Sequence, residues 1–214
     1  MKKLFTIISC CIFAASVQAQ IVSSHSRSVT TETANYPNYS RFEISYSPMT
    51  IKIDHESEGF TGIRLGYLQG TSISKTMPLY LEYGINAHYA WYSDTSHDEE
   101  ISSSVLNLNV PVNVAYKYAL NDDVYITPYV GLHLRGNILG KEEIEYKGRS
   151  SSIDLFDKDD MDDNTANRIQ VGGQIGVGLN YKQLYLGVGY NTQFGEYMED
   201  VTTSGFDVTV GYSF

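Results

Sequence analysis

The chain has 214 residues and a formal net charge of −10, and it is rich in tyrosine and glycine, with 18 of each. This length suits a single domain. The acidic balance argues against nucleic acid as a partner, because phosphate groups need a basic surface. The two cysteines, Cys10 and Cys11, lie near the start, so the rest of the chain has no thiol for a disulfide, a nucleophile or a metal site.

Residues 1–19 predict a secretory signal peptide. Residues 1–3 are positively charged, residues 4–15 are apolar, and residues 17–19 form a small-x-small cleavage site. The apolar run is too short for a transmembrane helix. A lipoprotein box ending at Cys10 is the alternative, but too few apolar residues would precede the cysteine. Residues 20–38 are rich in Ser and Thr without a pattern and predict a flexible periplasmic segment.

From residue 39 onwards, apolar and polar residues alternate with the period of two that is typical of strands. Eight segments are long enough, at about ten or more residues, to cross the outer membrane when tilted. They span residues 39–52, 59–69, 79–92, 104–118, 124–136, 168–181, 184–194 and 205–214. Pro111 cannot donate to a ladder, so we expect a bulge or a local break there.

The alternation separates an apolar and aromatic row from a small, polar or charged row. In the last segment the apolar row is Phe206, Val208, Val210, Tyr212 and Phe214, and Asp207 lies in the opposite row. An apolar outside with a polar inside is the pattern of a transmembrane β-strand. A soluble lipocalin-like barrel would reverse these faces, and the charged row, the signal peptide and the aromatic ends argue against it.

The connections differ in length at the two ends of the predicted barrel. Residues 70–78, 119–123 and 182–183 are short, whereas residues 54–58, 93–103, 137–167 and 195–204 are polar and two of these are long. Short periplasmic turns and longer outside loops are the usual asymmetry, and an even strand count places both termini in the periplasm. We therefore predict an all-β, transmembrane, antiparallel up-and-down barrel of eight strands over residues 39–214, with a long extracellular loop at 137–167.

The sequence resembles the outer membrane protein beta-barrel domain family, which includes small PorT-like barrels. The resemblance is carried by residues 41–44, 106–118, 127–132 and 208–214. It implies a porin-like barrel of a Gram-negative cell envelope, without a shared catalytic motif or a cofactor. In such barrels the last strand is also the signal read by the insertion machinery, here the row Phe206, Val208, Val210, Tyr212 and Phe214.

The interior of an eight-stranded barrel is filled by side chains. The inward rows carry four guanidinium groups and three carboxylates: Arg41, Arg64, Arg135 and Arg168 with Glu43, Glu82 and Asp207. Because an unpaired buried charge is strongly unfavourable, we expect these groups to pair in one network. Such a network favours a rigid, filled interior over a path for ions.

Two further features carry residue types that are found at catalytic or metal sites. His88 and His133 point inward and would suit acyl transfer or hydrolysis on lipid A if a nucleophile lay nearby, but no local motif supplies one, so no catalytic residue is predicted. Asp157, Asp159, Asp160, Asp162 and Asp163 offer carboxylates for Ca²⁺. This acidic run lacks the Gly and Glu of an EF-hand loop, so a solvated loop is expected instead of a metal site.

The sequence therefore predicts a monomeric barrel of the cell outer membrane with a structural or interaction role, which displays acidic surface loops. Its expected partners are outer-membrane lipid, lipopolysaccharide and a protein at the outer loops. A narrow pore or secretion accessory is the first alternative, and a lipid A-modifying enzyme is the second.

Overall fold

A computed structural model describes residues 36–214 except residues 54–55, 97–98, 147–148, 158–164 and 199. The predicted signal peptide, most of the 20–38 segment, and Asp159, Asp160, Asp162 and Asp163 lie outside these residues. Within them, no helix is long and apolar enough to span a bilayer.

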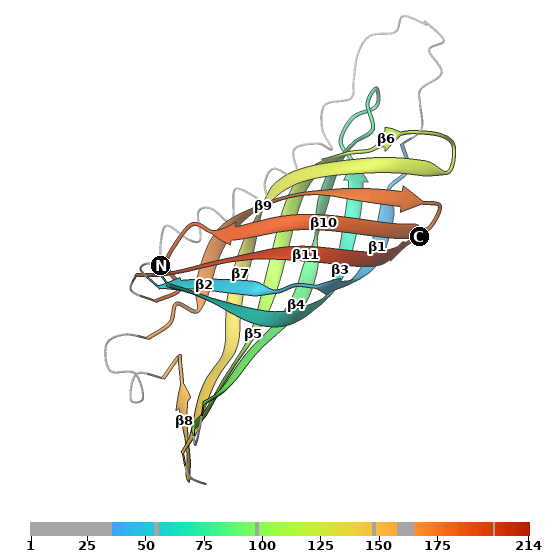
Figure 1. Cartoon of the computed structure of the whole chain (residues 1–214). Helices are drawn as coiled ribbons and strands as arrows, with labels where there is room; N and C mark the ends of the chain where they lie inside the picture. Colours follow the sequence, from blue (N-terminus) through green and yellow to red (C-terminus); the bar gives the residue numbers. More distant parts are fainter. Residues whose placement is uncertain (1–35, 54–55, 97–98, 147–148, 158–164, 199) are drawn as a thin grey trace, which may run out of the picture. The chain divides into compact units, whose positions relative to one another are not determined.

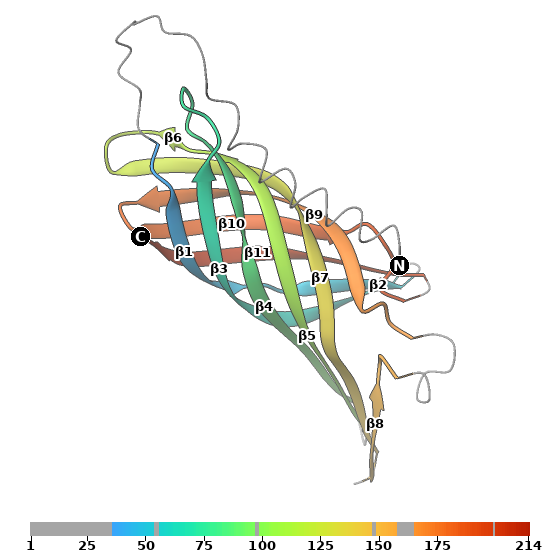
Figure 2. The ribbon, with the colours of Figure 1, turned by 180° about the vertical axis from the view of Figure 1, so that it is seen from behind.

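Antiparallel strands close into a ring (Figures 1 and 2). The strands are β1 Tyr39–Tyr46, β2 Met49–Ile53, β3 Glu56–Ser72, β4 Leu79–Ser96, β5 Glu99–Tyr116, β6 Tyr118–Ala119, β7 Val124–Tyr146, β8 Arg149–Asp154, β9 Ile169–Tyr181, β10 Leu184–Gln193 and β11 Val201–Ser213. The order is β1-β11-β10-β9-β7-β5-β4-β3, and β3 pairs back with β1. β2 continues β1 and pairs with the same two neighbours, so the ring has eight strand positions, as predicted.

The two faces of the wall are those that the alternation predicts. On β4, Ile85 and Tyr89 are exposed, whereas Glu82 and His88 are buried. The predicted outward row of β11 is likewise exposed and Asp207 is buried. Lipid requires an apolar outer face, and the polar side chains are buried inside the barrel. A lipocalin-like barrel would have the opposite arrangement, so that alternative is wrong.

Two predicted loops are largely strand. β4 and β5 have 18 residues each and β7 has 23, against 10 for β10, so three strands continue beyond the ring (Figure 1). β8 pairs with the distal part of β7. We call residues 92–96, 99–104, 141–146 and β8 the extension sheet. It was missed because, with neither lipid nor a core against it, its sequence lacks the apolar period that marks the membrane strands.

Pro111 does coincide with a local break. The β4–β5 ladder passes from Tyr83↔Val112 to Asn86↔Asn109 without a change of register, and the two pairs between them are missing. The register shift of β5 lies elsewhere, between Leu106 and Asn107 on the side facing β7. Pro111 therefore interrupts the β4–β5 ladder, whereas the bulge lies in the β5–β7 ladder.

The two ends of the barrel are distinct. One end, the short-turn end, holds the connections at 73–78 and 182–183, and there the C-terminus pairs with the first strand through hydrogen bonds of 2.9 Å in both directions between Ser40 and Phe214. The other end, the extension end, carries the extension sheet and the connections that follow β8 and β10.

Candidate functional site

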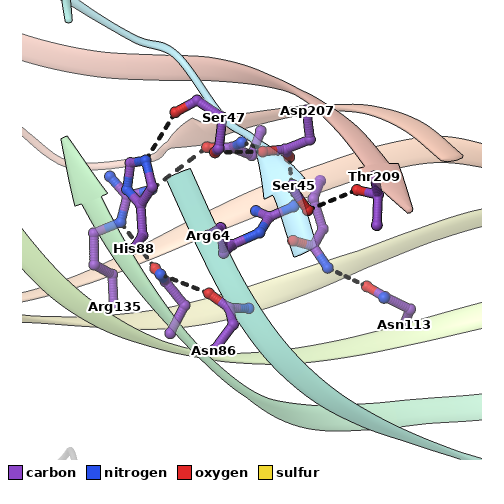
Figure 3. Close-up of polar contacts among 12 residues, drawn as sticks. Ser45, Ser47, Arg64, Asn86, His88, Asn113, Arg135, Asp207 and Thr209 are labelled. Atoms are coloured by element: carbon purple, nitrogen blue, oxygen red, sulfur yellow. Dashed lines mark hydrogen bonds and ion pairs between the residues drawn. The ribbon is translucent and has the colours of Figure 1, made fainter. Parts of the chain in front are cut away.

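Asp207 is the centre of a buried polar network in the lumen (Figure 3). Its carboxylate accepts a hydrogen bond from Ser47 Oγ at 2.5 Å and from Asn191 Nδ2 at 3.1 Å. It also pairs with Arg64 Nη2 at 2.9 Å. Residues from β3, β10 and β11 and the break between β1 and β2 thus meet at one carboxylate. The predicted pairing of Arg64 with an interior carboxylate is present.

Arg41 forms a second group nearer the short-turn end. Its Nε lies 2.5 Å from Glu43 Oε1, and its Nη1 lies 3.5 Å from Glu82 Oε1. The guanidinium also lies over the ring of Tyr185, 3.7 Å from its centroid. The Tyr39 hydroxyl donates to Glu82. Arg41 is therefore held by two carboxylates and an aromatic face.

Arg135 is held by amides, contrary to the expectation of full carboxylate pairing. Its Nε donates to Asn109 Oδ1 at 2.9 Å and its Nη2 to Asn191 Oδ1 at 3.4 Å. With its amide oxygen turned inward, Gln193 accepts from Arg135 Nη1 at 3.2 Å and from His133 Nε2 at 2.8 Å. Within the described part of the chain, no carboxylate forms a direct ion pair with Arg135.

Arg168 is not part of the lumen network, so this prediction was wrong. Its side chain is exposed, and its guanidinium lies 4.8 Å from the ring centroid of Phe156. The strand begins only at Ile169, so the inward alternation does not extend back to Arg168. At this position the chain still follows the connection between β8 and β9, and the backbone carbonyl of Arg168 accepts from Asn137 N.

Both histidines lie inside the barrel as predicted, with 3 % of His88 and 4 % of His133 exposed. His88 bonds to the Ser47 carbonyl at 2.8 Å and to Asn107 Oδ1 at 3.1 Å. Among the residues that the structure describes, neither imidazole has a hydroxyl or a carboxylate as a hydrogen-bond partner. The pairing of base and nucleophile that acyl transfer needs is not formed by these contacts.

Apolar layers close the lumen on both sides of the polar network. Towards the short-turn end the layer consists of Tyr39, Leu68, Tyr80 and Ala115. Towards the extension end there are two clusters, Met49, Phe60, Ala90 and Val105, and Leu155, Phe156, Ala166, Tyr197 and Val201. The cavity lined by Arg41, Arg64 and Glu82 measures about 30 Å³, room for a water molecule or two.

Tyr129 and Tyr185 fill the lumen above a patch of glycines, and the sequence reading did not single them out. A Cβ at Gly178 would lie 2.1 Å from the Tyr185 ring, and one at Gly176 would lie 2.4 Å from the Tyr129 hydroxyl. β9 and β10 alternate glycine with apolar residues, so their inward face has room for the ring of Tyr129 from β7 and for that of Tyr185 from β10. A glycine-rich inward row is the signal that could have located them.

Gly178→Ala is expected to lower the free energy of unfolding by about 1–3 kcal/mol, because the buried Tyr185 ring beneath Arg41 must move. Equilibrium unfolding in urea measures this loss. Gly136→Ala is the matched control on a strand, since its Cβ would meet only the Leu108 carbonyl oxygen at 3.8 Å. Equal losses in the two variants would contradict this packing role.

Lys117 lies in the connection between β5 and β6, and its Nζ is 3.2 Å from the centroid of the Tyr39 ring. Burial lowers the pKa of the Lys117 amine to about 8, although the nearby Glu82 opposes this shift. The folded state therefore favours the neutral amine, and stability should rise with pH from about 8 towards the unfolded pKa of about 10.4. Urea unfolding midpoints at pH 7 and pH 10 should show this increment in the wild type, and its absence in Lys117→Met. Equal increments would contradict it.

The remaining predicted site residues are partly described. Asp157 is exposed, and no group of three or more metal-ligating side chains gathers among the described residues. The row Phe206, Val208, Val210, Tyr212 and Phe214 lies on the outer wall, where the Phe214 ring is 5.6 Å from that of Phe42. Its role as an insertion signal stays a prediction.

The closed ring, the apolar wall and the filled polar lumen define a small transmembrane β-barrel of the bacterial outer membrane. The family described as "Outer membrane protein beta-barrel domain" matches residues 7–214, and the chain belongs to this family. No curated protein matches the sequence.

Solved structures of small barrels are similar to the chain. Ail, the attachment invasion locus protein of Yersinia pestis, in complex with the heparin analogue sucrose octasulfate, is 15% identical over 83% of this chain and 99% of its own, with a TM-score of 0.49. Neisserial surface protein A is 13% identical over 83% and 97%, with a TM-score of 0.45. The outer membrane enzyme PagL is 13% identical over 79% and 98%, with a TM-score of 0.43.

Proposed function

We propose that the barrel is a closed anchor that holds the extension sheet outside the cell for contact with a partner. The observation that carries this proposal is the length of β7. Its 23 residues far exceed the 9–11 or so that cross a membrane, and its distal part, residues 141–146, extends about 20 Å past the wall of the ring. The short turns at the opposite end support periplasmic termini, as the usual asymmetry of such barrels predicts.

The charge of the extension sheet indicates the kind of partner. Its described acidic side chains are Asp94, Glu100, Glu142, Glu143, Glu145 and Asp154, against Lys141 and Arg149. An acidic surface attracts a basic one and speeds its association. A protein with a basic patch is therefore the partner that this sheet favours. The layered closure of the lumen supports an anchor over a pore, and the histidine contacts support a role without catalysis.

Shortening the extension tests the proposal. Lys141 and Asp154 lie opposite each other in the β7–β8 ladder, so residues 142–153 can be replaced by an Asn-Gly turn without breaking the hairpin. The shortened barrel should keep its heat-modifiable mobility on gels, because its membrane strands are intact. Photo-crosslinking in cells from Ser102 on β5 should lose its partner adduct. An unchanged adduct would contradict the display function.

Orientation can be tested separately in intact cells. Ser151→Cys on β8 should react with a membrane-impermeant maleimide, whereas Thr76→Cys in the connection between β3 and β4 should react only after lysis. The native cysteines lie in the predicted signal peptide and will not interfere once it is removed. The reverse labelling pattern would place the extension sheet in the periplasm and sink the proposal.

A further inference from the structure

An open groove of about 510 Å³ lies on the outer wall, where the barrel continues into the extension sheet. Its volume falls within the range of about 300–1,000 Å³ that is usual for small-molecule sites. Two adjacent cross-strand rows line it. Tyr89, Leu106 and Leu139 pair in one row, and Ser104, Lys141 and Asp154 pair in the next. The wall thus changes from apolar to polar inside the groove.

The β-bulge explains why the groove forms here. The register shift of β5 against β7 leaves Ile138 without a partner, and both Ile138 and Leu139 are exposed, at 43% and 59%. Two consecutive apolar side chains therefore face outward at one level, where a regular strand would place only one. A bulge also bends its strand, so the distal part of β7 departs from the line of the wall.

The neighbouring strands leave the floor of the groove open. Pairing of β7 with β9 ends at Gly136↔Ile169, and pairing with β8 begins at Lys141↔Asp154. Among the described residues, the backbone hydrogen bonds that connect β7 to that side in between are one from Asn137 N and one to the Gly140 carbonyl. The gap between these two pairings forms a notch in the wall. The exposed apolar side chains at this level line the notch and are continuous with the lipid-facing surface.

We propose that this groove binds one molecule of a phosphorylated glycolipid of the lipid A class. An acyl chain would lie on Leu106 and Leu139, because this row is continuous with the lipid-facing wall. The phosphate would meet Lys141, whose Nζ pairs with Glu143 at 3.1 Å yet whose side chain is 56% exposed. This site rests on the proposed outward orientation of the extension sheet.

The mixed charge of the polar row favours a phosphorylated headgroup that also carries several hydroxyls, as a sugar does. Lys141 attracts a phosphate, but the nearby carboxylates of Glu143 and Asp154 repel one. Sugar hydroxyls beside the phosphate can donate to such carboxylates, as well as exchange hydrogen bonds with Ser104 and Ser152. Asp154 is already oriented, since its Oδ1 accepts from Phe156 N at 2.9 Å. A phosphorylated saccharide satisfies both signs of this row.

Trp91 provides the assay, because it is the single tryptophan of the chain and stacks on Tyr89 with centroids 5.6 Å apart. The full barrel is placed in nanodiscs of brominated phosphatidylglycerol, whose bromines quench Trp91. Lipid A should relieve the quenching at about one molecule per barrel. Lys141→Ala, and Ser152→Phe, which fills the groove, should each weaken the lipid A effect by about tenfold. Lys182→Ala should not, although Lys182 has a similarly exposed ion pair with Asp123.

Three results would overturn the site: relief only at bulk replacement of the lipid, equal relief by unbrominated phosphatidylglycerol, or wild-type behaviour of both groove variants. The assay uses purified barrel, so a missing protein partner leaves its outcome unaffected. If the wild-type barrel did not bind lipid A but Ser151→Cys were labelled from outside the cell, only the groove would be rejected. Labelling from the periplasm would reject the orientation on which the site rests.

Discussion

Asp207→Ala is expected to lower the free energy of unfolding by about 3–5 kcal/mol, the cost of breaking a buried ion pair from one side. The carboxylate accepts from Ser47 and Asn191 and pairs with Arg64 at 2.9 Å. Its loss leaves the Arg64 guanidinium, whose side chain is only 16% exposed, without a counterion in the lumen. It also removes the negative charge that offsets the repulsion between Arg64 and Arg135. Equilibrium unfolding in urea, followed by Trp91 fluorescence in lipid vesicles, measures the change.

Asp123→Ala is the matched control, since Asp123 pairs with Lys182 at 3.9 Å with 57% of its side chain exposed. Solvent screens such a pair, so a loss of about 0–1 kcal/mol is expected. Asp207→Asn, in combination with Arg64→Met, should recover part of the loss, because the unpaired cation is then removed. Similar losses for the Asp123 and Asp207 variants would show that the lumen is solvated and that its charges do not hold the barrel.

The strand positions could be predicted because lipid and lumen impose opposite demands on alternate residues. Tyr89 and His88 differ by one position, and lipid tolerates only the first. Every membrane strand therefore carries its register in its sequence. The extension sheet has no such constraint, so Ser102 and Ile101 read as loop although both pair with β7. The alternation of apolar and polar residues is absent from strands that contact neither lipid nor an apolar core.

The lumen contacts were less predictable, since they depend on which inward residues meet across the ring. Alternation correctly placed Arg41 and Arg135 inside, but it did not indicate that one is held by carboxylates and the other by amides. Arg168 was misplaced because the alternation was extended past the first residue of β9. Partner choice is set by strand stagger and by bulges, which single-sequence periodicity does not encode.

Tyr185→Ala is expected to cost about 3–5 kcal/mol, as for other large buried aromatic side chains. The ring covers Gly178 and Gly187, which cannot fill the space it would leave, and it supplies the face on which Arg41 lies. Tyr185→Phe should cost much less, because the ring supplies both the volume and the aromatic face. Tyr190→Ala on the same strand is the control, with a side chain that is 50% exposed on the lipid-facing wall. Urea unfolding of the three variants ranks these losses.

Planar-bilayer recordings of the same variants test whether the lumen stays closed to ions when the fold is less stable. The wild type should show no conductance steps, since the lumen cavity beside Arg41 measures about 30 Å³ and apolar layers lie on both sides of it. Tyr185→Ala should also stay at baseline despite its lower stability, because the layer around Tyr80 and the cluster around Phe156 close the lumen on either side of the void. The lumen stays closed when one ring is lost, because several layers close it. The free energy of unfolding falls, because the packing of that ring is lost. Steps in Tyr185→Ala would place closure at this single ring and would revive the narrow-pore hypothesis.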